Sequence, residues 1–164
     1  MRLSIVLATS EYLGMVPLVQ RAESLGFSRI WTTETPTRDA LVRALVLGLQ
    51  TERIGWASGI AYAFTRLPLA LAATAADVNT ALGGRFSLGL GAGTRGMRRN
   101  WFGIDDFNQP ASRLGEYAAL MRAAWAAESS LQFSGTFYRA NYDQFDGSRV
   151  AVPIWGSGLN PNRE

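Results

Sequence analysis

Short apolar runs alternate with helical patterns along this chain, and the alternation restricts the folds that the chain can adopt. The runs are typical of buried β-strands and cover residues 3–8, 27–33, 53–62, 85–90 and 152–155. Apolar residues recur at helical spacing in most of the segments between them. Repeated strand–helix units build a parallel sheet that is covered by helices. We therefore predict an α/β fold, either a doubly wound open sheet or a (β/α) barrel.

Residues at the segment ends predict where helices begin and end. Asp39 is expected to cap a helix, Pro68 suits the first turn of the next helix, and Ser112 is expected to cap a long one. Gly26 suits the left-handed position that follows the first helix. These signals place each helix between two predicted strands, as a parallel sheet requires.

Two further segments complete the prediction of secondary structure. Ser134 and Gly135 are typical of a two-residue hairpin loop between strands at 131–133 and 136–139. The arginine-rich segment that follows residue 94 lacks apolar periodicity, so no helix is predicted there. Given its length, the chain is treated as a single domain that spans residues 1–164.

The side chains that the sequence lacks exclude several chemistries. It contains no Cys, no His and no Lys, so all 16 basic residues are Arg. Thiolate chemistry, imidazole bases and Schiff-base lysines are therefore excluded. No metal site is expected either, because the chain has no dense carboxylate cluster. A reaction would rely on a carboxylate, a tyrosine or a bound cofactor.

Charge and hydropathy predict the kind of partner and the location. The formal net charge is +3, but most arginines are scattered, so nucleic-acid binding is not expected. No run approaches the roughly 20 apolar residues of a membrane span, and no leader peptide is recognisable. We expect a cytoplasmic protein whose partner is a small-molecule substrate.

In both candidate folds, ligands bind beyond the carboxyl ends of the strands. Glu34 follows the second strand and is the leading ionisable candidate, although a lone Glu more commonly caps a helix or forms an ion pair. The other candidates are small residues that follow the later strands, namely Ser58, Gly59, Ile60, Gly91, Ala92, Gly93, Thr94, Gly156, Ser157 and Gly158.

The glycines after the fourth strand have two interpretations. Gly91, Gly93 and Gly96 satisfy the spacing of a dinucleotide-binding loop, but such a loop usually follows the first strand. Small residues there allow either tight packing at a crowded strand end or close approach of the backbone to a flat ligand. The arginines at 95, 98 and 99 either bind an anionic group or form a solvated basic loop.

In combination and in order, these segments resemble the bacterial luciferase-like superfamily, and most closely its coenzyme F420-dependent oxidoreductases. The most specific matches lie at residues 22–34, 51–60 and 82–93, and weaker ones lie at 113–117, 133–138 and 152–161. The resemblance implies a TIM-type (β/α)8 barrel that binds the deazaflavin F420, or alternatively FMN, at the carboxyl ends of its strands. With about five of eight strand–helix units, the barrel would be incomplete here.

The resemblance also implies roles for particular residues. The bond between Gly59 and Ile60 matches a cis peptide that supports the coenzyme ring, Glu34 matches an acid near the ring, and residues 91–94 match the loop beside it. Residues 35–38, which follow the strand-two acid, read Thr-Pro-Thr-Arg where family members often have His. Thr94 and Arg95 stand where some relatives have an acid just after the glycine loop. Proton donors of those relatives therefore do not carry over.

Three functions are considered. The first is an oxidoreductase that transfers a hydride between F420 and an unknown organic substrate. The second is an FMN-dependent luciferase-like monooxygenase. The third is a truncated, non-catalytic remnant that acts as an assembly or binding module, because three strand–helix units of a barrel are missing. A homo-oligomer, most simply a dimer, is expected because a second chain could cover the open sheet edge.

Overall fold

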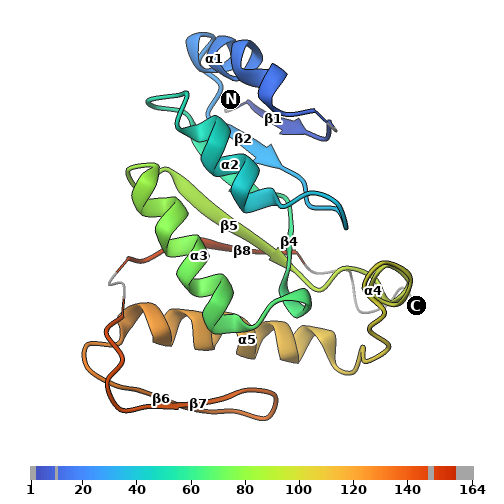
Figure 1. The fold of residues 1–164 in the computed structure, drawn as a ribbon, viewed down its shortest axis with the longest axis vertical. Helices are drawn as coiled ribbons and strands as arrows, with labels where there is room; N and C mark the ends of the chain where they lie inside the picture. The colour runs from blue at the N-terminus through green and yellow to red at the C-terminus, as the bar shows by residue number, and fades with distance from the viewer. Residues whose placement is uncertain (1–2, 10, 148–149, 158–164) are drawn as a thin grey trace.

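The computed structural model of the protein describes residues 3–9, 11–147 and 150–157 (Figure 1). Its helices are α1 (Val16–Ser24), α2 (Ala40–Gly48), α3 (Pro68–Ala81), α4 (Arg95–Phe102) and α5 (Pro110–Ala126), with short 3-10 turns η1 (Leu13–Met15) and η2 (Ala63–Thr65). Its strands are β1 (Ser4–Leu7), β2 (Arg29–Thr32), β3 (Gly55–Ser58), β4 (Ala61–Tyr62), β5 (Phe86–Gly91), β6 (Leu131–Ser134), β7 (Arg139–Tyr142) and β8 (Ile154–Ser157).

The main sheet is parallel and confirms the predicted α/β class. Its strands follow the order β1-β2-β3-β5, and β4 and β8 also pair with β5. Helices α2 and α3 lie in front of the sheet in Figure 1, as strand–helix units require. Within the described ranges, β1 and β8 each pair on one side only, so closure of the sheet is not observed there.

The third predicted strand is divided into β3 and β4 at the bond between Gly59 and Ile60, which is cis as the resemblance implies. Between Ala57 and Ala61 the chain advances four residues, whereas β5 advances only three, from Ser87 to Leu90. The extra residue is a bulge, which a glycine inside a strand predicts.

Close packing accounts for one glycine of β5 at this bulge. A Cβ atom on Gly89 would lie 1.9 Å from the carbonyl oxygen of Ser58, a distance that side chains do not tolerate. The Ser58 hydroxyl in turn donates to the carbonyl oxygen of Gly89 over 2.9 Å. Tight packing therefore explains the glycine at position 89.

Three helix signals are confirmed by the backbone. The carboxylate of Asp39 accepts hydrogen bonds from the N–H groups of Leu41 and Val42 at the start of α2. Pro68 is the first residue of α3, where its fixed φ suits the first turn. Gly26 follows α1 with a φ of +79°.

Two helices differ from the prediction. α5 begins at Pro110, so the expectation that Ser112 caps it is wrong; proline is well suited to the first turn. α4 forms where no helix was predicted. Thr94 caps it by accepting a hydrogen bond from the N–H of Met97, and Gly103 ends it with a φ of +66°. End signals therefore mark this helix, and its residues Trp101 and Phe102 pack against Tyr62.

The hairpin of β6 and β7 has a longer loop than predicted. Ser134 pairs with Arg139, which leaves residues 135–138 in the loop instead of two. The carboxylate of Glu116 in α5 accepts hydrogen bonds from the loop N–H groups of Thr136, Phe137 and Tyr138. A contact from another element thus fixes the loop, and a local pattern cannot reveal it.

Two charged side chains hold the segments that enter β3 and β5. Glu23 accepts hydrogen bonds from the backbone N–H groups of Glu52, Arg53 and Ile54. Arg85 donates to the carbonyl oxygens of Gly48, Thr51 and Ile54. These contacts lie at the amino-terminal ends of the strands. We call Glu23, Arg85 and their partners the lower end of the sheet, whatever its position in Figure 1.

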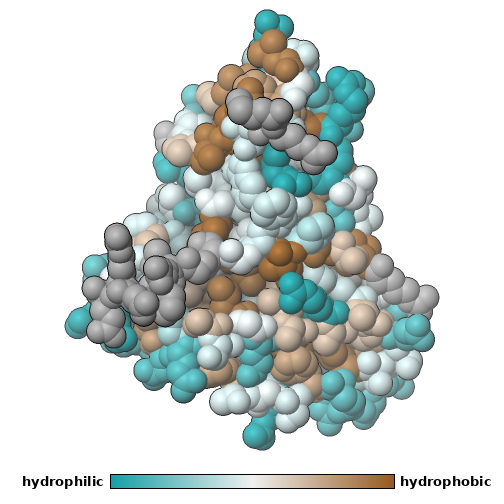
Figure 2. All heavy atoms as spheres, turned by 180° about the vertical axis from the view of Figure 1, so that it is seen from behind, coloured by the Kyte–Doolittle hydropathy of each residue, from teal (hydrophilic) through white to brown (hydrophobic). Residues whose placement is uncertain are grey.

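The face of the sheet opposite α2 is partly apolar. Thr32 of β2 donates to the carbonyl oxygen of Ala40 in α2, so its neighbour Trp31 points to the other face. There the rings of Trp31 and Trp155 meet edge to face with centroids 5.7 Å apart, and Arg29 lies over both. Apolar patches are visible on the molecule from behind (Figure 2). In the described ranges, no helix is long and apolar enough to cross a membrane.

Candidate functional site

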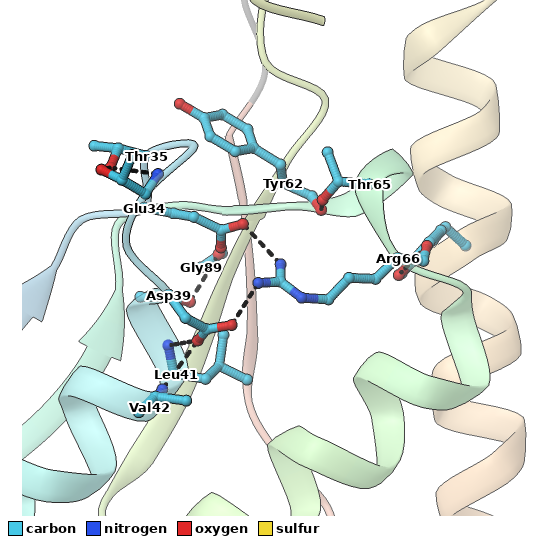
Figure 3. Close-up of polar contacts among 12 residues, drawn as sticks. Glu34, Thr35, Asp39, Leu41, Val42, Tyr62, Thr65, Arg66 and Gly89 are labelled. Atoms are coloured by element: carbon cyan, nitrogen blue, oxygen red, sulfur yellow. Dashed lines mark hydrogen bonds and ion pairs between the residues drawn. The ribbon is translucent and has the colours of Figure 1, made fainter. Parts of the chain in front are cut away.

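Two acids and one arginine meet beyond the carboxyl ends of β2 and β4 (Figure 3). Nη1 of Arg66 lies 2.8 Å from Oε1 of Glu34, and Nη2 lies 2.6 Å from Oδ2 of Asp39. We call these three residues the acid–arginine cluster. The ion-pair interpretation of Glu34 is thus confirmed, and Arg66 is the partner that sequence reasoning missed.

The cluster is tied to the helices around it. Asp39 uses Oδ1 to cap α2 and Oδ2 to bind Arg66, so one carboxylate serves both the helix and the ion pair. The carbonyl oxygen of Arg66 accepts a hydrogen bond from the hydroxyl of Tyr117 in α5 over 3.1 Å. Packing of α2 and α5 therefore fixes the arginine from both sides.

Burial dominates the electrostatics of Glu34. Its side chain is only 4% exposed. Burial raises its pKa, and Arg66 and the backbone of Tyr62 offset that rise only in part, so the pKa stays above the ordinary value. Glu34 therefore holds a proton at a higher pH than an exposed glutamate does, which is typical of functional carboxyls.

A pocket of about 360 Å³ opens beside the cluster. Its walls are the loop of residues 34–39, together with Thr65, Arg66 and Phe102. The lining combines hydroxyls, both signs of charge and one aromatic ring. Such a mixture suits a small polar ligand better than a purely apolar one.

Tyr62 adjoins the cluster and was also missed from the sequence. Its residue is 8% exposed, and its ring packs edge to face against Trp101 and Phe102 of α4, with centroids 6.3 and 5.8 Å apart. Burial, and then the charge of Glu34, raise the pKa of Tyr62. The phenol therefore stays protonated around neutral pH. In the sequence, only the position of Tyr62 just after the glycine-containing bulge could have indicated a role in the site.

The candidates after the third strand lie next to Tyr62. Ser58 is fully buried, and its hydroxyl donates a hydrogen bond to the carbonyl oxygen of Gly89. Gly59 and Ile60 are half-buried and directly precede β4. The backbone of Gly59 and Ile60 is thus the part of this segment that a ligand can reach.

The glycine loop lies beside the same strand end. Gly91 pairs with Tyr62, and a Cβ atom on Gly93 would lie 3.2 Å from the ring of Tyr62. Ala92 and Gly93 are half-buried, whereas Thr94 is exposed and its hydroxyl caps α4. This loop and β4 therefore form one continuous surface.

Strand β8 brings the third group of candidates to the same edge. Ser157 pairs with Gly91, and Gly156 pairs with Leu90. Gly156 is exposed, and a Cβ atom built on it meets no atom within 4 Å. Gly158 lies outside the described residues. We call the partly exposed backbone of 59–60, 92–93 and 156 the strand-end shelf.

Arg99 and Arg98 of α4 lie in different environments, so the solvated-loop interpretation applies to one of them and not to the other. Arg99 is exposed and pairs with Asp105, as expected of a solvated loop. Arg98 is only 3% exposed and lies over the rings of Phe64 and Phe107. Its Nε and Nη1 atoms are buried and make no hydrogen bond. Arg98 is thus a buried cation with unsatisfied donors, which is rare in proteins.

The described ranges hold no group of three or more possible metal ligands among His, Cys, Asp and Glu.

The sequence matches the family described as luciferase-like monooxygenase over residues 5–163. The chain belongs to this family. A putative coenzyme F420-dependent oxidoreductase of Mycobacterium tuberculosis is 33% identical over 122 residues, which are 74% of this chain and 35% of that protein. The resemblance to F420-dependent members is thereby confirmed.

Two solved structures of low sequence identity share the fold of this chain. The coenzyme F420-dependent tetrahydromethanopterin reductase of Methanopyrus kandleri gives a TM-score of 0.82 at 18% identity, covering 98% of this chain and 51% of that one. The oxygenating constituent of 3,6-diketocamphane monooxygenase of Pseudomonas putida, solved with FMN, gives 0.79 at 18% identity, covering 99% and 52%. The chain thus spans about half the length of these enzymes.

Proposed function

We propose that the protein binds coenzyme F420 and transfers a hydride between it and an organic substrate. The observation that carries this proposal is the similarity to a relative named as F420-dependent, at 33% identity. We further propose that β1 and β8 belong to a TIM-type barrel like that of the solved relatives, and that the protein forms a homo-oligomer. Light scattering measures the oligomeric state.

The residues at the strand ends fit a flat cofactor. The shelf presents backbone and small side chains, so a planar ring can approach without meeting a Cβ atom at Gly59, Gly93 or Gly156. We propose that the ring is held by residues 59–60, 92–94 and 156–158, while the buried residues 58 and 91 hold these strand ends in position. Thr94 contributes backbone because its hydroxyl caps α4. When bound, F420 supplies or accepts a hydride, and the chain supplies position and proton transfer.

We propose Glu34 as the ionisable residue of the site. Its elevated pKa supports this role, and Arg66 keeps it in place beside β4. In Glu34→Gln the amide keeps an acceptor for Arg66, so the fold should persist while the charge is lost. The expected result is a lower rate of turnover at unchanged affinity for F420.

Titration of the protein with F420, followed by coenzyme fluorescence, tests the proposal. Gly156→Phe should weaken binding at least tenfold, because the new ring would cover the shelf while its Cβ meets no atom within 4 Å. Gly115→Phe in α5 is the matched control, since its Cβ also meets no atom and the site is elsewhere. Failure of F420 to bind at high micromolar concentration would contradict the proposal.

FMN-dependent oxygenation is the second candidate. It is supported by the likeness in fold to the FMN complex of the Pseudomonas enzyme. A parallel titration with FMN separates the two cofactors, and oxygen consumption with reduced FMN measures the activity. Binding of neither cofactor would favour the non-catalytic module.

A further inference from the structure

Tyr62 carries the one phenol that adjoins both the strand-end shelf and the acid–arginine cluster in the described part of the chain. Its ring is fixed by Trp101 and Phe102 and lies against Gly93. Its hydroxyl makes no hydrogen bond with the residues that the structure describes. The hydroxyl points away from Arg66, on the side of Thr35 (Figure 3). The ring is therefore held firmly while its donor stays available.

The carboxylate of Glu34 is already bonded to Arg66, whereas the hydroxyl of Tyr62 has no hydrogen-bond partner among the described residues. Oε1 of Glu34 accepts from Arg66 at 2.8 Å, and Oε2 is buried. Glu34 lines the pocket, but its side chain is only 4% exposed and Oε1 is already bound to Arg66. Of the two proton-bearing groups at this edge, Tyr62 is thus the one that can touch a substrate lying on the shelf.

We infer that Oη of Tyr62 donates a proton to the oxygen of a carbonyl substrate, an aldehyde or ketone, which makes Tyr62 a catalytic residue. This inference rests on the proposed function. The carbonyl carbon gains the hydride that reduced F420 supplies, and the electron pair of the broken C=O π bond moves to oxygen. That oxygen takes the phenolic proton, giving an alcohol, and the phenolate of Tyr62 regains a proton from water.

A neutral phenol suits this step. It donates a hydrogen bond to a developing alkoxide, which is the role of a general acid. The charged groups on the side of β2 and η2 are Glu34, Asp39 and Arg66, while α4 presents aromatic rings to Tyr62. Glu34 acts here as a positioning residue, because its negative charge opposes ionisation of the phenol.

The test compares wild type with Tyr62→Phe, which keeps the ring and its packing and removes only the hydroxyl. Tyr142→Phe is the matched control on the exposed hairpin. F420 affinity, measured by fluorescence, should change by no more than about twofold. The turnover number for reduction of small ketones and aldehydes by reduced F420 should fall about 100-fold, as loss of a general acid does.

A titration of tyrosinate absorbance adds a measurement that does not depend on turnover. Tyr62→Phe should remove one transition above the ordinary tyrosine range, and Glu34→Gln should move that transition to lower pH. Equal turnover in wild type and Tyr62→Phe, or Glu34→Gln without any shift, would overturn the inference while leaving F420 binding intact. Absence of F420 binding by wild type would instead overturn the proposed function.

Discussion

At the lower end of the sheet, Glu23 and Arg85 make their hydrogen bonds mainly with backbone groups. At the carboxyl ends, Glu34 and Arg66 bind each other. Oε2 of Glu34 and two guanidinium nitrogens of Arg98 are buried and make no hydrogen bond. Both ends thus use the same residue types. Glu23 and Arg85 are satisfied by the chain's own backbone, although Nε of Arg29 at the start of β2 is also buried without a hydrogen bond.

The two ends also shift carboxyl pKa values in opposite directions. Burial raises the pKa of Glu23, but three backbone N–H groups and Arg53 lower it more, so it lies below the ordinary value. For Glu34, burial outweighs the ion pair and the pKa is raised. The difference indicates that Glu23 contributes stability at neutral pH through its backbone hydrogen bonds, whereas Glu34 is kept buried at some cost in stability.

Arg85→Met should have the largest effect and tests the lower end. Three backbone carbonyls lose a donor, and we expect a loss of about 3 kcal/mol in the free energy of unfolding. Chemical denaturation measures it. Arg122→Met, at an exposed position of α5, is the control and should change little. A loss as small as that of the control would remove the contrast between the two ends.

Arg66→Met should have the next largest effect, and this effect should depend on pH. The variant leaves the buried Glu34 without its cation, which raises the folded-state pKa of Glu34 further above the unfolded value. Stability is then retained at low pH, where Glu34 is protonated in both states, and falls as pH rises through the folded-state pKa. We expect a loss of about 2 kcal/mol at pH 8 and less at pH 5. A loss independent of pH would contradict the role of Glu34.

Glu23→Gln should have a smaller effect with the opposite pH dependence. The pKa of Glu23 is lowered, so its carboxylate stabilises the fold above the unfolded-state pKa, and this contribution disappears as pH falls through the folded-state pKa. We expect a loss of about 1 kcal/mol at pH 7, since the side chain remains partly in water. Thermal unfolding at pH 7 and pH 3 measures the difference, which should be smaller at the lower pH.

Arg98→Met should have the smallest effect and sharpens the contrast. A buried cation without an acid partner contributes little net stability, so replacement by an apolar side chain should change unfolding by no more than about 1 kcal/mol, in either direction. Arg99→Met, which removes an exposed arginine of the same helix, is the control. A large loss would mean that Arg98 is as fully satisfied as Arg85.

The positions of the main-sheet strands along the sequence and several helix boundaries could be predicted because local residues determine them. Asp39 and Pro68 act within one turn of their helices, and apolar runs mark the buried strands. α4 was missed because arginines separate its few apolar residues, whereas Thr94 and Gly103 mark its two ends. The hairpin loop was missed because Glu116 fixes it from another helix.

The candidate site was predicted only as single positions. Glu34 stood out as a lone acid after a strand, but its partner Arg66 lies 32 residues away. The pairing of β2 with β3 and of β4 with β5 brings the two together, and no local pattern encodes that. Tyr62 was missed because a tyrosine in a strand usually belongs to the core, and only the bulge at 59–60 indicates otherwise.

Because the sequence has no His, Cys or Lys, few groups of the protein titrate near neutral pH. Apart from the amino terminus, no side chain has an ordinary pKa between those of the carboxyls and those of the tyrosines. Glu34 is the one described carboxyl whose pKa is shifted upward. Burial of Glu34 beside Arg66 therefore moves its titration toward an interval in which no other side chain of this sequence ordinarily titrates.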